Sequence, residues 1–167
     1  MSTPIEFERK FLVNADQAAL VFGSATHSEV VEQAYFMQDD VRCARLRKRE
    51  SQWLLTCKMA TGEKGKAFEA ETTVDAVFAQ ALWPLCPARV QKRRHYVQVG
   101  PFGWEVDQFL DHNTGLVLAE IELSTQAESD QLDTMFPAWV GQEVTGDPRY
   151  FNTWLASNVA PGLAARP

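Results

Sequence analysis

The stretch Ile5-Glu6-Phe7-Glu8-Arg9-Lys10-Phe11-Leu12-Val13 decides the fold of this chain. In a β-strand successive side chains point to opposite faces, so Glu6, Glu8 and Lys10 share one face. The other face carries apolar side chains and Arg9. A row of charges is costly to bury, because an unpaired buried ion loses several kcal/mol of solvation. The stretch therefore predicts a strand whose charged face meets opposite charges, a ligand or a metal ion.

The same arrangement recurs along the chain as pairs of like charges two residues apart. The pairs are Arg45 and Arg47, Glu69 and Glu71, Lys92 and Arg94, Glu105 and Asp107, and Glu120 and Glu122. A single pair usually marks the solvated face of an antiparallel strand. Here the opposite faces are apolar, as Trp104 and Val106 show beside Glu105. The set as a whole favours a closed sheet with a charged interior and an apolar outer face covered by helices.

Eight segments have the composition of strands, and most are separated by short turns. They are residues 5–13, 29–37, 41–49, 53–60, 66–74, 89–98, 104–111 and 116–124. A helix is expected at residues 76–82, with its stripe of Val77, Phe78, Ala81 and Leu82 packed on the core. Residues 126–158 are expected to be helical or irregular. The predicted fold is α+β: a closed eight-stranded antiparallel β-barrel with flanking helices.

The 167 residues fit one domain, which we place at residues 1–159, with a loose tail at 160–167. No apolar tract could span a bilayer and no secretory signal is visible, so we expect a cytoplasmic protein without a membrane partner. The net charge of −6 argues against a nucleic-acid partner. Cys43, Cys57 and Cys86 lack the spacing of a metal site and are expected to be reduced core thiols.

Carboxylates and cations that face the same interior can bind a metal ion and an anion side by side. Carboxylates suit a hard divalent cation such as Mg²⁺ or Mn²⁺, which prefers oxygen ligands. Arginine and lysine suit phosphate, because guanidinium binds two oxygens at once and ammonium is a compact charge. The combination predicts a metal-bridged phosphate ligand. The alternative is a structural barrel in which the charges only neutralise one another.

Glu6-Phe7-Glu8-Arg9-Lys10 resembles the N-terminal E-x-E-x-K signature of the CYTH superfamily, the triphosphate tunnel metalloenzymes. The resemblance continues in the family's order to about Leu155, through residues 44–47, 55–58, 69–71, 92–94, 104–107, 119–122 and 143–150. It is to the small bacterial members in particular. It implies a tunnel-shaped barrel in which a metal-activated water hydrolyses inorganic triphosphate (tripolyphosphate), with nucleoside triphosphates as a further substrate class.

The resemblance also implies a role for each matching residue. Catalytic roles fall to Glu6, Glu8, Lys10, Glu120 and Glu122. Substrate phosphates would be bound by Lys10, Arg45, Arg47, Lys58, Lys92 and Arg94. The metal, Mg²⁺ or Mn²⁺, would be held by residues from Glu6, Glu8, Glu69, Glu71, Asp107, Glu120 and Glu122. Which acid of the pairs at 69/71 and 105/107 binds metal, and which pairs with a base, stays open. Tyr35 and residues 150–152 are expected either to line a tunnel end or to pack in the core.

Two positions depart from the family pattern. Ala67 stands where small members commonly carry arginine, and His95 stands where tyrosine often follows the basic pair. Both bear on substrate choice and rate more than on reaction class. The same fold also serves class IV adenylate cyclases and thiamine triphosphatases, and a non-catalytic polyphosphate-binding module is the alternative of a different class. A homodimer is expected only on general grounds.

Overall fold

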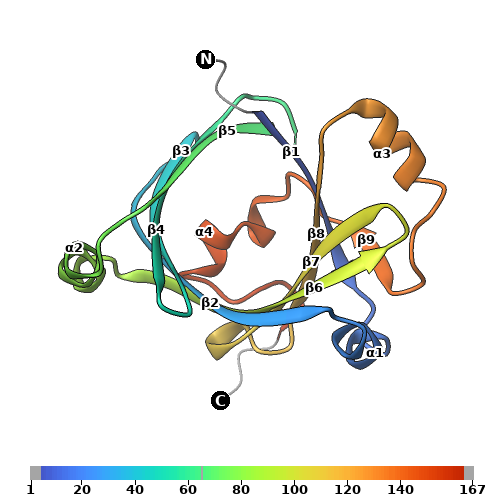
Figure 1. The fold of residues 1–167 in the computed structure, drawn as a ribbon, viewed down its shortest axis with the longest axis horizontal. Coiled ribbons are helices and arrows are strands. Elements are labelled where there is room, and N and C mark those ends of the chain that lie inside the picture. Colours follow the sequence, from blue (N-terminus) through green and yellow to red (C-terminus); the bar gives the residue numbers. More distant parts are fainter. Residues whose placement is uncertain (1–4, 65, 164–167) are drawn as a thin grey trace.

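The computed structural model describes residues 5–64 and 66–163, and the side chains of residues 7–64 and 66–163. Within these residues nine strands form one sheet in the order β5-β4-β3-β2-β6-β7-β8-β1-β9, and β5 also pairs with β1. Eight strands therefore close into an antiparallel barrel, as predicted, which Figure 1 shows as a ring. The strands are β1 (Ile5–Val13), β2 (His27–Gln38), β3 (Arg42–Arg49), β4 (Gln52–Ala60), β5 (Lys66–Thr73), β6 (Ala88–Val99), β7 (Phe102–Phe109), β8 (Val117–Leu123) and β9 (Val140–Glu143).

Strand register brings the charged positions together. In the β1–β8 pair, Glu8 stands opposite Glu122 and Lys10 stands opposite Glu120. Directly opposed residues in antiparallel strands have their side chains within about 5 Å of each other. The charges that alternate along β1 therefore meet the alternating acids of β8 on the inner face of the barrel.

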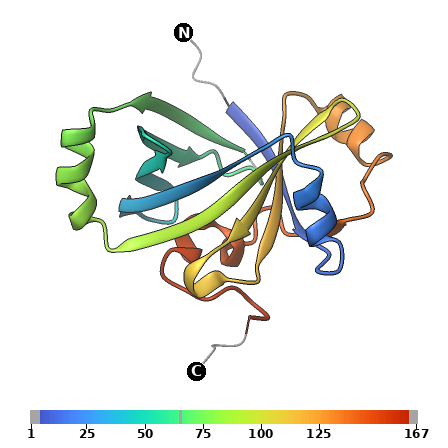
Figure 2. The ribbon, with the colours of Figure 1, turned by 60° about the horizontal axis from the view of Figure 1, so that its bottom comes forward.

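The main apolar core lies outside the barrel, between the sheet and the helices α1 (Ala18–Gly23) and α3 (Gln126–Leu132). Its buried members from the sheet are Phe11, Val13, Val97, Phe102, Trp104, Val106, Ala119, Ile121 and Leu123. Val21 of α1, Leu132 of α3 and Trp139 cover them. Figure 2 shows α1 and α3 on one side of the barrel and α2 (Ala76–Leu82) on the other. The apolar outer face covered by helices is therefore confirmed.

The apolar stripe expected to pack α2 on the core is wrong at three of its four positions, since Val77, Phe78 and Ala81 are all exposed. Val77 is 75% exposed and Phe78 is 52% exposed. The helix instead buries Ala79 against Leu46 and Trp53, with Leu82 packed beside them. The stripe pattern does not say which side of a short helix faces the barrel, because that depends on where the chain leaves β5 and re-enters β6.

The C-terminal segment fills one end of the barrel interior, and Figure 1 shows α4 (Asn152–Leu155) inside the ring. There Tyr150, Leu155 and Ala156 join a cluster of buried residues from the inner faces of the strands. The strand members are Tyr35, Val90, Phe109 and Leu118. Ala160 is buried too, and its N–H donates to Asn113 Oδ1 at 2.8 Å. The division into a domain and a tail stays a prediction, and residues 164–167 lie outside the described part.

Two further features differ from expectation. Strand β9 was not predicted, and it forms because Phe11 and Val13 pair with Glu143 and Val140 beyond the stretch of β1 that β5 covers.

All three cysteines are free, as expected, but Cys57 is exposed on the outer face of β4, so it is not a core thiol. No helix within the described ranges has the length and apolar character needed to cross a membrane.

Candidate active site

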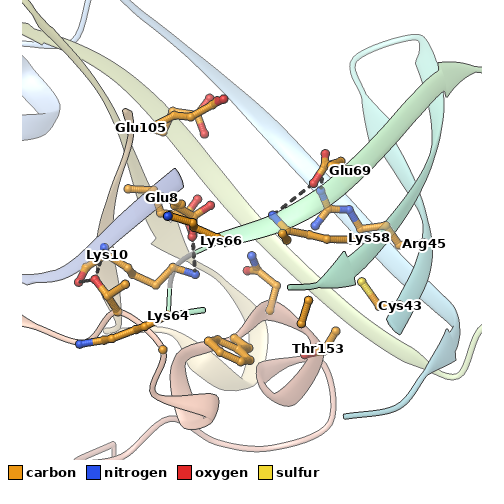
Figure 3. Close-up of a pocket in the computed structure, with 18 of the residues that line it drawn as sticks. Glu8, Lys10, Cys43, Arg45, Lys58, Lys64, Lys66, Glu69, Glu105 and Thr153 are labelled. Atoms are coloured by element: carbon orange, nitrogen blue, oxygen red, sulfur yellow. Dashed lines mark hydrogen bonds and ion pairs between the residues drawn. The ribbon is translucent and has the colours of Figure 1, made fainter. Parts of the chain in front are cut away.

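A cavity of about 870 Å³ occupies the barrel interior beside the C-terminal segment. Its lining includes Glu8, Lys10, Arg45, Arg47, Lys58, Glu69, Lys92, Arg94, Glu120 and Glu122. Figure 3 shows side chains from β1, β3, β4 and β5 directed towards this common space. Glu71 and Asp107 do not belong to the lining. The backbone of Glu6 lies in β1, but its side chain lies outside the described residues. Ten predicted site residues, scattered over more than a hundred positions of sequence, thus surround one cavity.

Lys10 is held by two carboxylates on the β1–β8 wall. Its Nζ lies 2.9 Å from Glu120 Oε1 and 3.3 Å from Glu8 Oε1. Burial by itself lowers the pKa of the Lys10 ammonium, but Glu120 and Glu8 more than offset this and raise it above its ordinary value. Lys10 therefore keeps its charge inside the barrel.

A second cluster joins β6, β7 and β8. Arg94 Nε and Nη2 each donate to Asp107, at 2.7 Å, and Nη2 also donates to Glu120 at 2.8 Å. Glu105 accepts from Arg94 Nη1, and Lys92 donates to Asp107 as well. The side chains of Lys92 and Asp107 are 1% and 0% exposed. Asp107 therefore lies behind the cavity wall and is bound by two cations, Lys92 and Arg94, that line the cavity.

The pKa values of two acids in this second cluster, Glu120 and Glu105, are shifted in opposite directions. Burial opposes the charge of Glu120, yet Lys10, Lys92 and Arg94 hold the pKa of that carboxyl well below its usual range. Burial raises the pKa of Glu105, and the carboxylates of Glu120 and Asp107 add to the rise against the opposing effect of Arg94. Glu120 is thus the fixed negative charge of this wall.

The opposite wall, from β3, β4 and β5, is predominantly cationic. Lys58 and Arg45 both approach Glu69, at 3.2 and 3.8 Å. Burial raises the pKa of Glu69, but Lys58 and Arg45 outweigh it and lower the pKa overall. Arg45 is 8% exposed, and its Nε has no acceptor among the described residues. An unpaired buried donor costs about 1–3 kcal/mol, and an anionic ligand that accepted a hydrogen bond from Arg45 Nε would remove this cost.

Glu71 is engaged by its neighbours rather than by the cavity. Its Oε2 accepts from Thr56 Oγ1 at 2.7 Å and from Arg47 Nη1 at 3.3 Å. Arg47 is also held by Gln33, whose Oε1 accepts from Arg47 Nε at 3.1 Å. The geometry thus separates the acids that orient a base, such as Glu71 and Asp107, from the acids that reach the cavity.

Carboxylates suitable for a hard cation lie on the β1–β8 wall. Glu8 and Glu122 stand directly opposite each other and both line the cavity. No ion pair involves Glu122 within the described part of the chain, so its carboxylate is open to the cavity. Among the described side chains no cluster of three or more metal-binding groups is preformed. The carboxylate of Glu122, and that of Glu8 through the oxygen that does not face Lys10, nevertheless fit a divalent cation, and Glu6 lies two residues before Glu8.

Several cavity residues were not among the predicted site residues. Lys64 reaches the cavity from the turn between β4 and β5, Lys66 from the first position of β5, and Tyr96 from β6. The Gly62-Glu63-Lys64 sequence of the turn was a usable signal, since a basic glycine-containing turn adjoins a cationic strand. The expectation for residues 150–152 holds in both forms: Tyr150 packs in the core, and Phe151 and Asn152 line the cavity.

The two departures from the family pattern occupy different surfaces. Ala67 is part of the cavity lining, so the absence of an arginine at this position changes the wall itself. His95 is buried on the outer face of β6, where its ring stacks on Phe22 of α1 with centroids 4.3 Å apart. Its Nδ1 lies 2.8 Å from Ser28 Oγ. His95 therefore affects the packing of α1 rather than contact with a ligand in the cavity.

His95 leads to a prediction about stability and pH. Burial lowers the pKa of its imidazole below 6.5, so the folded chain favours the neutral ring. The unfolded chain then binds this proton more readily. We expect the free energy of unfolding to be highest above about pH 6.5 and to fall as the pH drops through the lowered pKa of the folded state. Urea unfolding at several pH values would measure this decrease.

The matched variant for that measurement is His95→Phe, which keeps an aromatic ring against Phe22 and has no proton to bind. Because His27, His112 and the carboxyl groups are unchanged, subtracting the pH dependence of the variant isolates the contribution of His95. The same loss of stability below about pH 6.5 in both proteins would contradict the prediction.

Comparison with known proteins places this geometry in a family. A family model described as the CYTH domain matches residues 4–150. An inorganic triphosphatase of Acetivibrio thermocellus is 37% identical over 157 residues, which cover 92% of this chain and 94% of that protein. An inorganic triphosphatase of Nitrosomonas europaea is 30% identical over 158 residues, which cover 92% and 98%.

A crystal structure of an inorganic triphosphatase has the same fold, with a TM-score of 0.63 at 30% identity. The match covers 96% of this chain and 98% of that one. The family match spans most of the sequence, and the barrel with its charged interior is the one that the resemblance implied. This chain belongs to the CYTH family.

Proposed function

We propose that this protein is a metal-dependent hydrolase of inorganic triphosphate, with nucleoside triphosphates as a further substrate class. The observation that carries the proposal is one cavity lined by the six predicted cationic residues together with the carboxylates of Glu8 and Glu122, in a chain similar to proteins named inorganic triphosphatases. A triphosphate chain carries several negative charges and many acceptor oxygens. Such a cavity offers it both the compensating charge and the donors.

The cations have unequal access to a substrate. Arg45 has a buried donor that finds no acceptor in the described part of the chain, and Lys58 stands on the same wall, so these two are proposed to contact phosphate oxygens directly. Lys10 and Arg94 lie between carboxylates and the cavity, where they bind phosphate while Glu120 fixes their positions. Lys92 also lines the cavity, but its side chain is almost completely buried and its ammonium is bound by Asp107, so it is proposed to add positive charge to the wall.

The acids divide in the same way. Glu8 and Glu122, with Glu6, are proposed to hold the divalent cation, for which Mg²⁺ and Mn²⁺ are the candidates. When bound, such a cation would neutralise charge on phosphate oxygens and acidify water. Glu120 has both oxygens engaged, by Lys10 and Arg94. Glu122 has none engaged within the described residues, so it is the better placed of the two to accept a proton from an attacking water. Asp107, Glu69 and Glu71 are proposed to position the cations.

The direct test is phosphate release from tripolyphosphate, ATP and pyrophosphate with Mg²⁺, with Mn²⁺ and with EDTA. We expect metal-dependent turnover of tripolyphosphate that Glu8→Gln abolishes, since this change removes a proposed metal ligand without altering side-chain size. Glu32→Gln is the control, because Glu32 lies 3.3 Å from Lys48 on the outer face of the barrel.

The alternative functions predict different products and substrates, which measurements of cyclic AMP formation, thiamine triphosphate hydrolysis and tripolyphosphate binding would show. A class IV adenylate cyclase would form cyclic AMP and pyrophosphate from ATP, and a thiamine triphosphatase would prefer thiamine triphosphate. A polyphosphate-binding module would bind tripolyphosphate without releasing phosphate, and Ala67→Arg would then be the next variant. A structural barrel would show neither binding nor turnover. The cytoplasmic location and the homodimer stay predictions.

A further inference from the structure

Asn152 is the first residue of α4, and its side chain lines the cavity. Asn152 belongs to the C-terminal segment that fills one end of the barrel, so it lies where the cavity meets that segment. No role follows for it from the charged strands. Its contact with Lys92 and its position at the cavity determine which amide atoms can reach a ligand.

The orientation of this amide follows from its partner. Asn152 Oδ1 lies 3.5 Å from Lys92 Nζ. An ammonium group has only donors, so it must face the amide oxygen and not the amide nitrogen. The Nδ2 group is then directed away from Lys92. Within the described part of the chain Nδ2 has no acceptor, which leaves two N–H donors beside the cavity.

Lys92 makes this orientation persistent. Its side chain is 1% exposed, and it is bound by Asp107 and lies 5.6 Å from the ring of Phe109. A flip of the Asn152 amide would place its N–H groups against a buried cation, which is unfavourable for both groups. The buried lysine therefore holds the amide with its donors available to a ligand.

We propose that Asn152 is a substrate-binding residue whose Nδ2 donates a hydrogen bond to a phosphate oxygen of bound triphosphate, while Lys92 holds its Oδ1. The inference rests on the proposed function and adds a neutral donor to the charged groups proposed to bind phosphate. Asn152 belongs to the segment that closes one end, so it binds the phosphate group nearest to α4. It thereby helps to set how deeply a triphosphate chain enters the barrel.

Two variants separate the donor from the acceptor. Asn152→Ala removes both, and we expect it to raise the KM for tripolyphosphate about tenfold, as for a lost hydrogen bond to a charged group. Asn152→Asp keeps an oxygen for Lys92 but removes the donors and adds a negative charge. We expect tripolyphosphate to bind it about a hundredfold more weakly, with no decrease in the thermal midpoint. Asn158→Ala is the matched control, since Asn158 Nδ2 donates to Trp154 O at 2.8 Å at the far end of α4.

The readouts are KM and kcat with metal, and calorimetric binding of tripolyphosphate in EDTA. Wild-type binding by Asn152→Asp would overturn the donor role, as would an Asn152→Ala protein that loses stability but binds tripolyphosphate normally. If the wild-type protein neither binds nor hydrolyses tripolyphosphate, the proposed function fails together with this inference. A fully active wild-type protein with unaffected Asn152 variants would contradict this inference alone.

Discussion

Replacing Glu122 by glutamine is expected to lower triphosphate hydrolysis at least about a hundredfold and to leave the fold as stable as before, or more so. Glu122 stands directly opposite Glu8 and has no ion pair within the described residues. Two facing carboxylates without a bound cation repel each other, so removing one charge relieves the repulsion. The same change removes the open carboxylate that is proposed to hold the metal or accept the proton of water.

The opposite signs of the two effects make this variant informative. Turnover of tripolyphosphate at increasing Mg²⁺ or Mn²⁺ would show the loss, together with a weaker apparent affinity for the metal. Thermal unfolding in EDTA would show an unchanged or higher midpoint. Active sites commonly trade stability for function in this way. Glu32→Gln again serves as the control, and undiminished turnover by Glu122→Gln would exclude Glu122 from the reaction.

Replacing Asp107 by alanine is expected to cost about 3–5 kcal/mol of unfolding free energy, because it leaves two buried cations without their shared partner. Arg94 donates to Asp107 through two nitrogens, and Lys92 donates to it as well. The Asp107 side chain is 0% exposed, and those of Lys92 and Arg94 are 1% and 10% exposed. A single domain has only about 5–15 kcal/mol of stability in total, so the loss would be a large share of it.

Urea unfolding would measure this loss as a lower transition midpoint. Asp107→Asn keeps an acceptor for Arg94 and is expected to lie between the wild-type protein and Asp107→Ala. Asp40→Ala is the control, since Asp40 is exposed in the turn between β2 and β3 and is expected to change stability by less than about 0.5 kcal/mol. A loss below about 1 kcal/mol for Asp107→Ala would mean that Lys92 and Arg94 find other partners.

Much of the barrel was predictable from local pattern. The side chains of a strand alternate with a period of two, so Arg45 and Arg47 necessarily share a face, as do Lys92 and Arg94. The apolar residues between such charges showed that the outer face would be covered. The same argument was weaker for α2, where Ala79 and not Val77 meets Trp53. A short helix has several apolar faces, and only its attachment to the sheet selects one.

The sequence by itself determined eight of the nine described strands and which of their charges face inward, because alternation is a property of the backbone at each position. Only the tertiary structure decided which acids are enclosed by cations, as Asp107 is, and which remain open, as Glu122 does. It also decided that β9 extends β1 and that α4 brings Asn152 to the cavity. These outcomes depend on register and barrel closure, which join residues more than a hundred positions apart, and no local pattern encodes such distances.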